Sequence, residues 1–129
     1  MLDRVPRNLQ FDGGKMTATE HEILTPLYRA FNARDIDRAL AGMRPDVIWA
    51  NGWEGGNVHG HAGVRDYWTR QWRAIDPHVE PTGFAVRGNR VVVDVHQVVR
   101  GLDGALIAER AVEHIFTLED GLVARFEIA

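Results

Sequence analysis

Two stretches near the carboxyl end decide the fold: Arg90-Val-Val-Val-Asp-Val-His-Gln-Val-Val-Arg100 and Arg110-Ala-Val-Glu-His-Ile-Phe-Thr-Leu118. Both are rich in β-branched and aromatic residues, which fit a pleated surface. Turn signals separate these stretches from each other and from flanking strands: Gly88-Asn89, Gly101-Leu-Asp-Gly104 and Glu119-Asp-Gly121. We therefore predict that residues 77–129 form an antiparallel meander of four strands.

Strands of about ten residues span roughly 33 Å, a length at which a sheet twists and curls. A curled sheet needs something to fill its concave face. The order expected along the chain is helix, helix, short strand, helix and then four strands, which is an α+β pattern. We predict a cone-shaped curved antiparallel sheet with three amino-terminal helices packed over its concave face.

The amino-terminal half supplies these helices. Thr19-Glu-His-Glu22 has the spacing of a capping box. The helix that follows has an apolar stripe to bury: Ile23, Leu24, Leu27, Tyr28 and Phe31. Because Pro26 lies in this stripe, either the helix kinks there or Thr25-Pro26 begins it. Asp35 is a good N-cap for a short second helix that buries Ile36, Leu40 and Met43.

A short strand, Val47–Asn51, and a glycine-rich loop, Gly52–Asn57, lead to the third helix. That helix has apolar residues at helical spacing: Val64, Tyr67, Trp68, Trp72 and Ile75. Residues 1–16 are expected to be a flexible leader. Residues 17–129 are expected to form a single domain.

Composition narrows the function. The chain has 129 residues, 45% hydrophobic and 26% charged, as is ordinary for one globular domain. A net charge of −3 offers no basic surface, so nucleic acid and anionic membranes are poor partners. No apolar run reaches the roughly 20 residues that span a bilayer, and there is no cysteine for a disulfide or a thiolate. We expect a cytoplasmic protein that works without a cofactor.

Three segments resemble the SnoaL-like branch of the nuclear transport factor 2-like superfamily: Tyr28-Arg-Ala-Phe-Asn-Ala-Arg-Asp35, Gly60-His-Ala-Gly-Val-Arg-Asp-Tyr67 and Phe116-Thr-Leu-Glu-Asp-Gly121. The resemblance covers residues 19–129 and implies a cystatin-like α+β barrel with a hydrophobic pocket. This superfamily includes ketosteroid isomerases, polyketide cyclases, epoxide hydrolases and dehydratases, and also proteins that only bind a ligand or a partner. The fold alone therefore leaves the function open.

Ketosteroid isomerases of this superfamily use a base aspartate at the end of the first strand, a tyrosine on the first helix and a protonated aspartic acid. Aligned by hand, the matching positions hold Asn51, Leu27 rather than Tyr28, and His114. Since an amide cannot take a proton, the resemblance does not carry the base over to Asn51.

Limonene-type epoxide hydrolases use an Asp–Arg–Asp set, and the matching positions hold Gln97, Val95 and Ile128. Their water-positioning tyrosine and asparagine match Trp49 and Asn51, so only the asparagine remains. SnoaL-type cyclases place an acid late in the final strand, which this chain is expected to end too early to supply. None of the three catalytic sets is intact.

His114 is the strongest candidate for chemistry. Strand alternation places it on one face with Val112, Phe116 and Leu118, which we assign to the concave side. In an apolar cavity, desolvation lowers the pKa of an imidazole and leaves it neutral, able to act in proton transfer near pH 7. The alternative is a structural polar cluster in which His114 hydrogen-bonds to Asn51 or Gln97.

The remaining predicted site residues bind substrate. The neutral amide side chains of Asn51 and Gln97 could orient a carbonyl group of the substrate or bind an oxyanion. Alternatively, they could hydrogen-bond to each other. Aromatic rings suit a flat hydrophobic ligand, although most of them belong to the core, and Trp53 in its glycine-rich loop is the best placed to face a ligand. The predicted binding residues are Asn51, Gln97, Trp49, Trp53, Tyr67, Trp68, Phe116 and Phe126.

His59-Gly-His61, with Glu54 or Asp66, offers a different class of site, a cupin-like metal centre. In a cupin that motif lies on a strand, whereas here helical spacing starts within a few residues. His61 is more simply a helix cap or a rim residue. We therefore predict no metal ligand and keep the metal site as an alternative.

Asp94 and His96 alternate to the convex face, where Val92, Val98 and Ile115 leave an apolar patch. A homodimer packed through the sheet would cover this patch. Two functions follow from the whole sequence. One is a cofactor-independent proton-transfer enzyme, of isomerase, dehydratase or cyclase type, that uses His114 as acid or base on a small hydrophobic molecule. The other is a non-catalytic ligand-binding or accessory dimeric domain with the same pocket.

Overall fold

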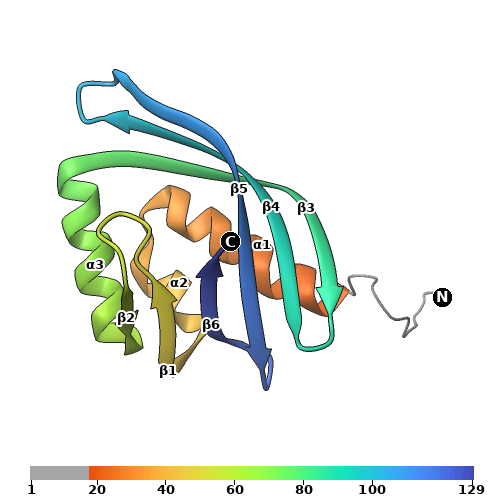
Figure 1. Ribbon diagram of the computed structural model, residues 1–129. Coiled ribbons are helices and arrows are strands. Elements are labelled where there is room, and N and C mark those ends of the chain that lie inside the picture. The colour runs from red at the N-terminus through yellow and green to blue at the C-terminus, as the bar shows by residue number, and fades with distance from the viewer. Residues whose placement is uncertain (1–17) are drawn as a thin grey trace.

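A computed structural model describes residues 18–129 (Figure 1). The helices are α1 (Ala18–Ala33), α2 (Ile36–Ala41) and α3 (Gly60–Ala74). The strands are β1 (Met43–Ala50), β2 (Asn57–His59), β3 (Ile75–Arg87), β4 (Arg90–Gly101), β5 (Leu106–Glu119) and β6 (Leu122–Ile128). The expected leader, residues 1–16, lies outside the described residues.

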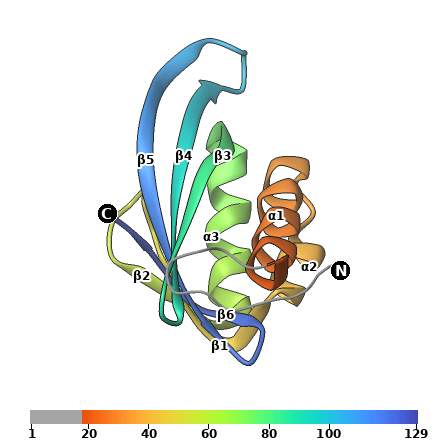
Figure 2. The ribbon, with the colours of Figure 1, turned by 90° about the vertical axis from the view of Figure 1, so that its right-hand side faces the viewer.

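The six strands form one sheet in the order β2-β1-β6-β5-β4-β3. The pairs β3–β4, β4–β5 and β5–β6 are all antiparallel, which confirms the predicted meander. Figure 2 shows the helices together on one side of this curved sheet, and the tip of the β4–β5 hairpin extends beyond them. The α+β class and the helix-covered concave face are thus confirmed.

The start of β1 differs from the prediction. Met43 was expected to end the second helix, with the strand beginning at Val47, but β1 begins at Met43. Gly42 closes α2 by donating its N–H to the Ala39 carbonyl at 3.1 Å, and the Val123 N–H of β6 donates to the Gly42 carbonyl at 2.9 Å. These bonds bring β1 beside β6 in a parallel pair that local sequence patterns did not indicate.

Helix α1 continues through Pro26, so the alternative start at Thr25-Pro26 is wrong. The proline ring is exposed, and so is Glu22, whose carbonyl loses its helical partner. Water can therefore reach the unpaired carbonyl on the outer side of the helix. The opposite side of α1 carries Leu24, Leu27 and Tyr28 into the core, as the stripe predicted.

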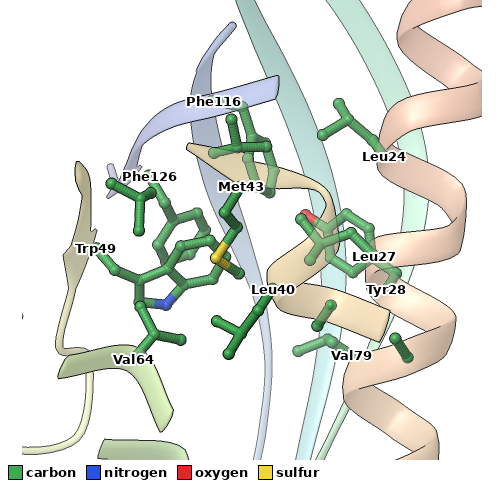
Figure 3. Packing of buried hydrophobic residues seen from close by; sticks show 14 of the residues in the cluster. Leu24, Leu27, Tyr28, Leu40, Met43, Trp49, Val64, Val79, Phe116 and Phe126 are labelled. Carbon is green, nitrogen blue, oxygen red and sulfur yellow. The ribbon is translucent and has the colours of Figure 1, made fainter. Parts of the chain in front are cut away.

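Aromatic rings from several elements meet in that core (Figure 3). Trp49 of β1 stacks on Phe126 of β6 with ring centroids 4.1 Å apart, and its ring meets the edge of Trp68 of α3 at 5.4 Å. Such pairs contribute about 0.5–1.5 kcal/mol each beyond the burial of their surface.

Within residues 18–129, every helix is too short or too polar to cross a membrane.

Candidate functional site

A cavity of about 570 Å³ lies between the concave face of the sheet and helices α1 and α3. This volume falls within the roughly 300–1,000 Å³ that is typical of small-molecule pockets. Buried rings of the core line one part of the cavity, and exposed residues of the β1–β2 loop and the start of β5 line its mouth. The lining is mainly apolar, with a few polar side chains among it.

All the residues that the sequence nominated lie at this one cavity: His114, Asn51, Gln97, Trp49, Trp53, Tyr67, Trp68, Phe116 and Phe126. Alternation along β5 does place His114 and Phe116 on the concave side, and Gln97 of β4 shares that side. Their shared location is a structural fact. Their roles in binding or catalysis stay predictions.

His114 is buried, with 6% of its surface exposed, and its hydrogen-bond partner is Tyr28. The Tyr28 hydroxyl oxygen lies 2.8 Å from Nδ1 of His114, and the two rings are nearly parallel, 3° apart. Neither Asn51 nor Gln97, the partners expected for a structural cluster, bonds to His114 within the described part of the chain. The polar contact of His114 thus comes from helix α1.

Burial sets the protonation of this pair. Desolvation lowers the pKa of His114 to about 4 and raises the pKa of the buried Tyr28 hydroxyl above its ordinary value. At neutral pH the imidazole is therefore neutral and the phenol keeps its proton. A buried O–H needs an acceptor, and His114 Nδ1 is the acceptor in reach, so the Tyr28 hydroxyl donates to Nδ1.

This hydrogen bond fixes the tautomer of His114. When Nδ1 accepts, the ring proton of a neutral imidazole is on Nε2. Within residues 18–129, the one fully enclosed side-chain nitrogen or oxygen without a partner is Nε1 of Trp72. Nε2 of His114 also has no partner there but is not sealed off, so its N–H is open to a ligand in the cavity.

Asn51 has a structural task that the sequence did not reveal. Its Oδ1 accepts hydrogen bonds from the backbone N–H groups of Trp53, at 3.0 Å, and Glu54, at 2.7 Å. Its Nδ2 donates to Oε1 of Glu54 at 3.0 Å. Glu54 in turn bonds Arg70 of α3, and the two partners lower the pKa of Glu54, Arg70 first and Asn51 second. The amide of Asn51 therefore holds the β1–β2 loop and is largely occupied.

Sequence reasoning missed three lining residues with polar groups, Tyr28, Gln71 and Arg110. Gln71 Nε2 donates to the Tyr67 hydroxyl at 3.4 Å, and both side chains are buried. Its position four residues after Tyr67 on a helix was a usable signal, because such residues share a face. Tyr28 was counted as core, and only its contact with His114 marks it as part of the site.

The structure does not support the alternative metal site. His59 is exposed, and Nε2 of His61 donates to the Met43 carbonyl at 3.0 Å, which ties the start of α3 to β1. Among the described residues, no three His, Cys, Asp or Glu side chains come close enough together to hold a metal ion.

Comparison with solved structures places this geometry among known folds. TerC, crystallised with polyporic acid, is 30% identical, with 86% of this chain and 90% of that chain covered and a TM-score of 0.77. A putative polyketide cyclase from Sinorhizobium meliloti is 23% identical over 84% and 94% of the two chains, with a TM-score of 0.73. Rv0760c from Mycobacterium tuberculosis, in complex with estradiol-17β-hemisuccinate, is 14% identical over 85% and 92%, with a TM-score of 0.72.

Curated protein sequences include no match to the chain. A family profile, in contrast, matches most of it: the SnoaL-like domain aligns with residues 24–126. That range begins in α1, ends in β6 and contains all the residues that line the cavity except Ile128. Because this profile covers most of the chain, the chain belongs to the SnoaL-like domain family.

Proposed function

We propose that this SnoaL-like protein binds a small hydrophobic or aromatic molecule in its cavity and acts on it without a cofactor through His114. The observation that carries the proposal is the buried Tyr28–His114 pair, with its 2.8 Å hydrogen bond and its free Nε2, at an apolar cavity. A polar pair that is buried in this way has a cost in desolvation. A ligand oxygen that meets Nε2–H would complete its hydrogen bonding.

The tautomer favours a donor role over a base role. A neutral imidazole whose Nε2 carries the proton can donate a hydrogen bond to a carbonyl or hydroxyl oxygen as negative charge develops there. A single donor of this kind typically contributes about 10²–10³-fold in rate. Because burial lowers the pKa of His114 to about 4, the ring is a weak base at neutral pH.

The chemistry that fits is polarisation of a carbonyl group. Hydrogen bonding from Nε2–H to the carbonyl oxygen makes the neighbouring C–H more acidic. The C–H proton then passes to water, and a solvent proton returns to carbon or to oxygen. Isomerisation, dehydration and cyclisation of ring ketones all pass through such an enol-like species, so the proposal covers this set of reactions and not one member of it.

Two structural neighbours support a ligand of this type. TerC was crystallised with polyporic acid, and Rv0760c with estradiol-17β-hemisuccinate. Both are small organic ligands, and both proteins have the fold described here.

Deuterium exchange tests the proposal whichever product is formed, because all of these reactions share the loss of the C–H proton. A panel of aromatic and polycyclic ketones is incubated with the protein in D₂O, and exchange at the carbon next to the carbonyl is followed by mass spectrometry. We expect faster exchange for at least one ketone with the wild type and a loss of about 10²-fold or more in His114→Ala. His59→Ala, at an exposed histidine, is the matched control and should keep the activity.

A non-catalytic ligand-binding or accessory domain is the second candidate, and one observation favours it. No carboxylate lines the cavity among the described residues, so none is available there as a general base. Ketones that bind the wild type with no exchange above that of His114→Ala would establish this second function.

The homodimer expected for such a domain stays a prediction, as does the cytoplasmic location. Val92, Val98 and Ile115 of the convex face are half-buried within one chain. On the same face, Nε2 of His96 and Oε2 of Glu109 form a hydrogen bond of 2.8 Å. If two copies pack through this face, Val98→Asp should convert a dimer to a monomer in sedimentation velocity. A wild type that sediments as a monomer contradicts the dimer.

A further inference from the structure

One formally charged side chain lines the cavity. With His114 neutral, Arg110 of β5 is the only charged residue among the lining residues within 18–129, and no aspartate or glutamate opposes it. The ligand site is therefore positive by one charge. A cavity with a lone positive charge discriminates against cations and favours anions.

Among residues 18–129, no other side chain occupies the guanidinium of Arg110. Some other arginines of the chain are paired, for example Arg70 with Glu54 at 2.7 Å and Arg65 with Asp37 at 2.5 Å. Arg110 has no hydrogen bond or ion pair to any other described residue. Its five N–H donors, in a planar fork that matches a carboxylate, remain available.

The surroundings of Arg110 strengthen its hold on an anion. Gln97 lies directly opposite it in the β4–β5 register and also lines the cavity, so an amide donor stands beside the guanidinium. The cavity also has an exposed apolar rim, made of Trp53, Ile107 and Ile128. Of these, Ile107 is the one near Arg110 along β5, whereas Ile128 pairs with His114. Arg110 is itself exposed, so its attraction for an anion is that of a charge partly screened by solvent.

A bulge in β5 builds part of this rim. Val99 pairs with Ala108, and the next residue, Arg100, pairs with Leu106, which leaves Ile107 without a partner. Strict alternation would turn Ile107 away from the side that Ala108 faces. The bulge instead lets both residues line the cavity next to Arg110.

The two polar ends of the cavity have a defined spacing. Arg110 and His114 are four residues apart on the same face of β5, which corresponds to about 13 Å along the strand. A ligand that reaches both therefore has an oxygen near Nε2 of His114, a ring system along the apolar walls and an acidic group at the mouth.

We infer that Arg110, with Gln97 beside it, selects ligands that carry an ionised acidic group, such as a carboxylate or an acidic enol, at the end that faces the cavity mouth. The inference rests on the proposed function, since it names the class of ligand for the same cavity. It makes Arg110 a specificity-determining residue that acts at a distance from His114.

Pyrenebutyrate and pyrenebutanol test this inference. They share the flat ring system and the chain length but differ in the acidic group, and pyrene fluorescence reports binding of both. We expect the wild type to bind the acid more tightly than the alcohol by roughly five- to thirty-fold, the range between an exposed ion pair and a charge-assisted hydrogen bond. Added salt should reduce this preference, since the mouth is open to solvent.

Substitutions then test whether Arg110 causes the preference for the acid over the alcohol. Arg110→Gln should reduce the acid-to-alcohol ratio to about one without weakening the alcohol, whereas Arg110→Lys should keep part of it because the charge remains but the fork is lost. Arg87→Gln is the matched control, because Arg87 is exposed, has no partner among the described residues and lies away from the cavity. It changes net charge by the same amount and should leave the ratio unchanged.

The outcomes separate the inference from the proposed function. Equal binding of acid and alcohol by the wild type, or a preference that survives Arg110→Gln, overturns the role of Arg110 and leaves the apolar pocket intact. Failure of both probes to bind any variant instead removes the aromatic ligand class itself, and the inference with it.

Discussion

The Tyr28 hydroxyl lies 2.8 Å from Nδ1 of His114 and joins helix α1 to strand β5 across 86 positions of the chain. Both side chains are buried, and burial keeps both neutral. In a neutral pair, one proton donor meets one acceptor, so the hydrogen bond decides which nitrogen of the imidazole carries the proton. The unoccupied Nε2–H that results is the group that a ligand meets.

Tyr28→Phe should release this tautomer. The ring of phenylalanine keeps the packing against Phe116, but Nδ1 loses its donor. We expect a mixture of the two neutral tautomers in place of mainly Nε2–H, visible in the ¹⁵N shifts of the His114 ring. The buried nitrogen left without a partner should cost about 1–2 kcal/mol in the free energy of unfolding. An unchanged tautomer ratio would show that Tyr28 does not control the ring.

Stability should fall between pH 6.5 and pH 4 because of His114. Burial lowers its pKa from 6.5 to about 4 in the folded protein. In this window the unfolded chain binds a proton that the folded chain does not, so acidification favours unfolding. Above pH 6.5 the ring is neutral in both states and the contribution to stability is fully present. Its loss on lowering the pH to about 4 amounts to about 3 kcal/mol.

Urea unfolding at pH 7 and pH 4.5 measures this effect. His114→Gln removes the titrating ring, so its loss of stability between the two pH values should be smaller than that of the wild type. His59→Gln, at an exposed position, should behave like the wild type. If the wild type and His114→Gln lose the same amount, the acid sensitivity comes from other groups.

Substitution of Asn51 should destabilise the β1–β2 loop, because the amide of Asn51 is hydrogen-bonded to that loop. Asn51→Ala leaves the N–H groups of Trp53 and Glu54 without their acceptor, which should cost about 1–3 kcal/mol and speed hydrogen exchange at both amides. Asn51→Asp keeps an acceptor but places a second carboxylate beside Glu54, so its loss of stability relative to the wild type should be larger at pH 7 than at pH 5. Stability of Asn51→Ala equal to that of the wild type would leave the amide free for a ligand role.

Substitutions of Trp53 and Trp68 should distinguish a residue that only lines the cavity from one that also supports the core. Trp53 is 38% exposed at the cavity mouth, whereas Trp68 is 1% exposed although it also borders the cavity. Trp68→Ala should lower the free energy of unfolding by about 3–5 kcal/mol. Trp53→Ala should change it by about 0.5 kcal/mol or less but weaken pyrenebutanol binding several-fold. Unchanged binding in Trp53→Ala would remove this ring from the ligand site.

Local sequence patterns predicted correctly which side chains share a face of a single strand or helix. The strand residues around His114 alternate between two faces. This period, together with the more aromatic character of the face with His114 and Phe116, placed the two residues on the concave side. Helical spacing likewise brought Tyr67 and Trp68 to one face of α3. Such predictions succeed because side-chain direction follows from the backbone period of the element itself.

The same patterns could not predict contacts between side chains of different elements. Whether Tyr28 meets His114, and whether Asn51 faces a ligand or its own loop, depends on how α1 crosses the sheet and how the chain turns after β1. The same holds for Met43, which joins β1 because Val123 of β6 bonds to Gly42.

The sequence by itself therefore determined most of the elements, the inward faces and nine of the residues that border the cavity, since period and propensity are local properties. Only the tertiary structure decided which of those residues hydrogen-bond to each other. It also showed that Arg110 has no partner among the described residues. Hydrogen bonds require atoms within about 3 Å, and that proximity is set by packing of distant segments.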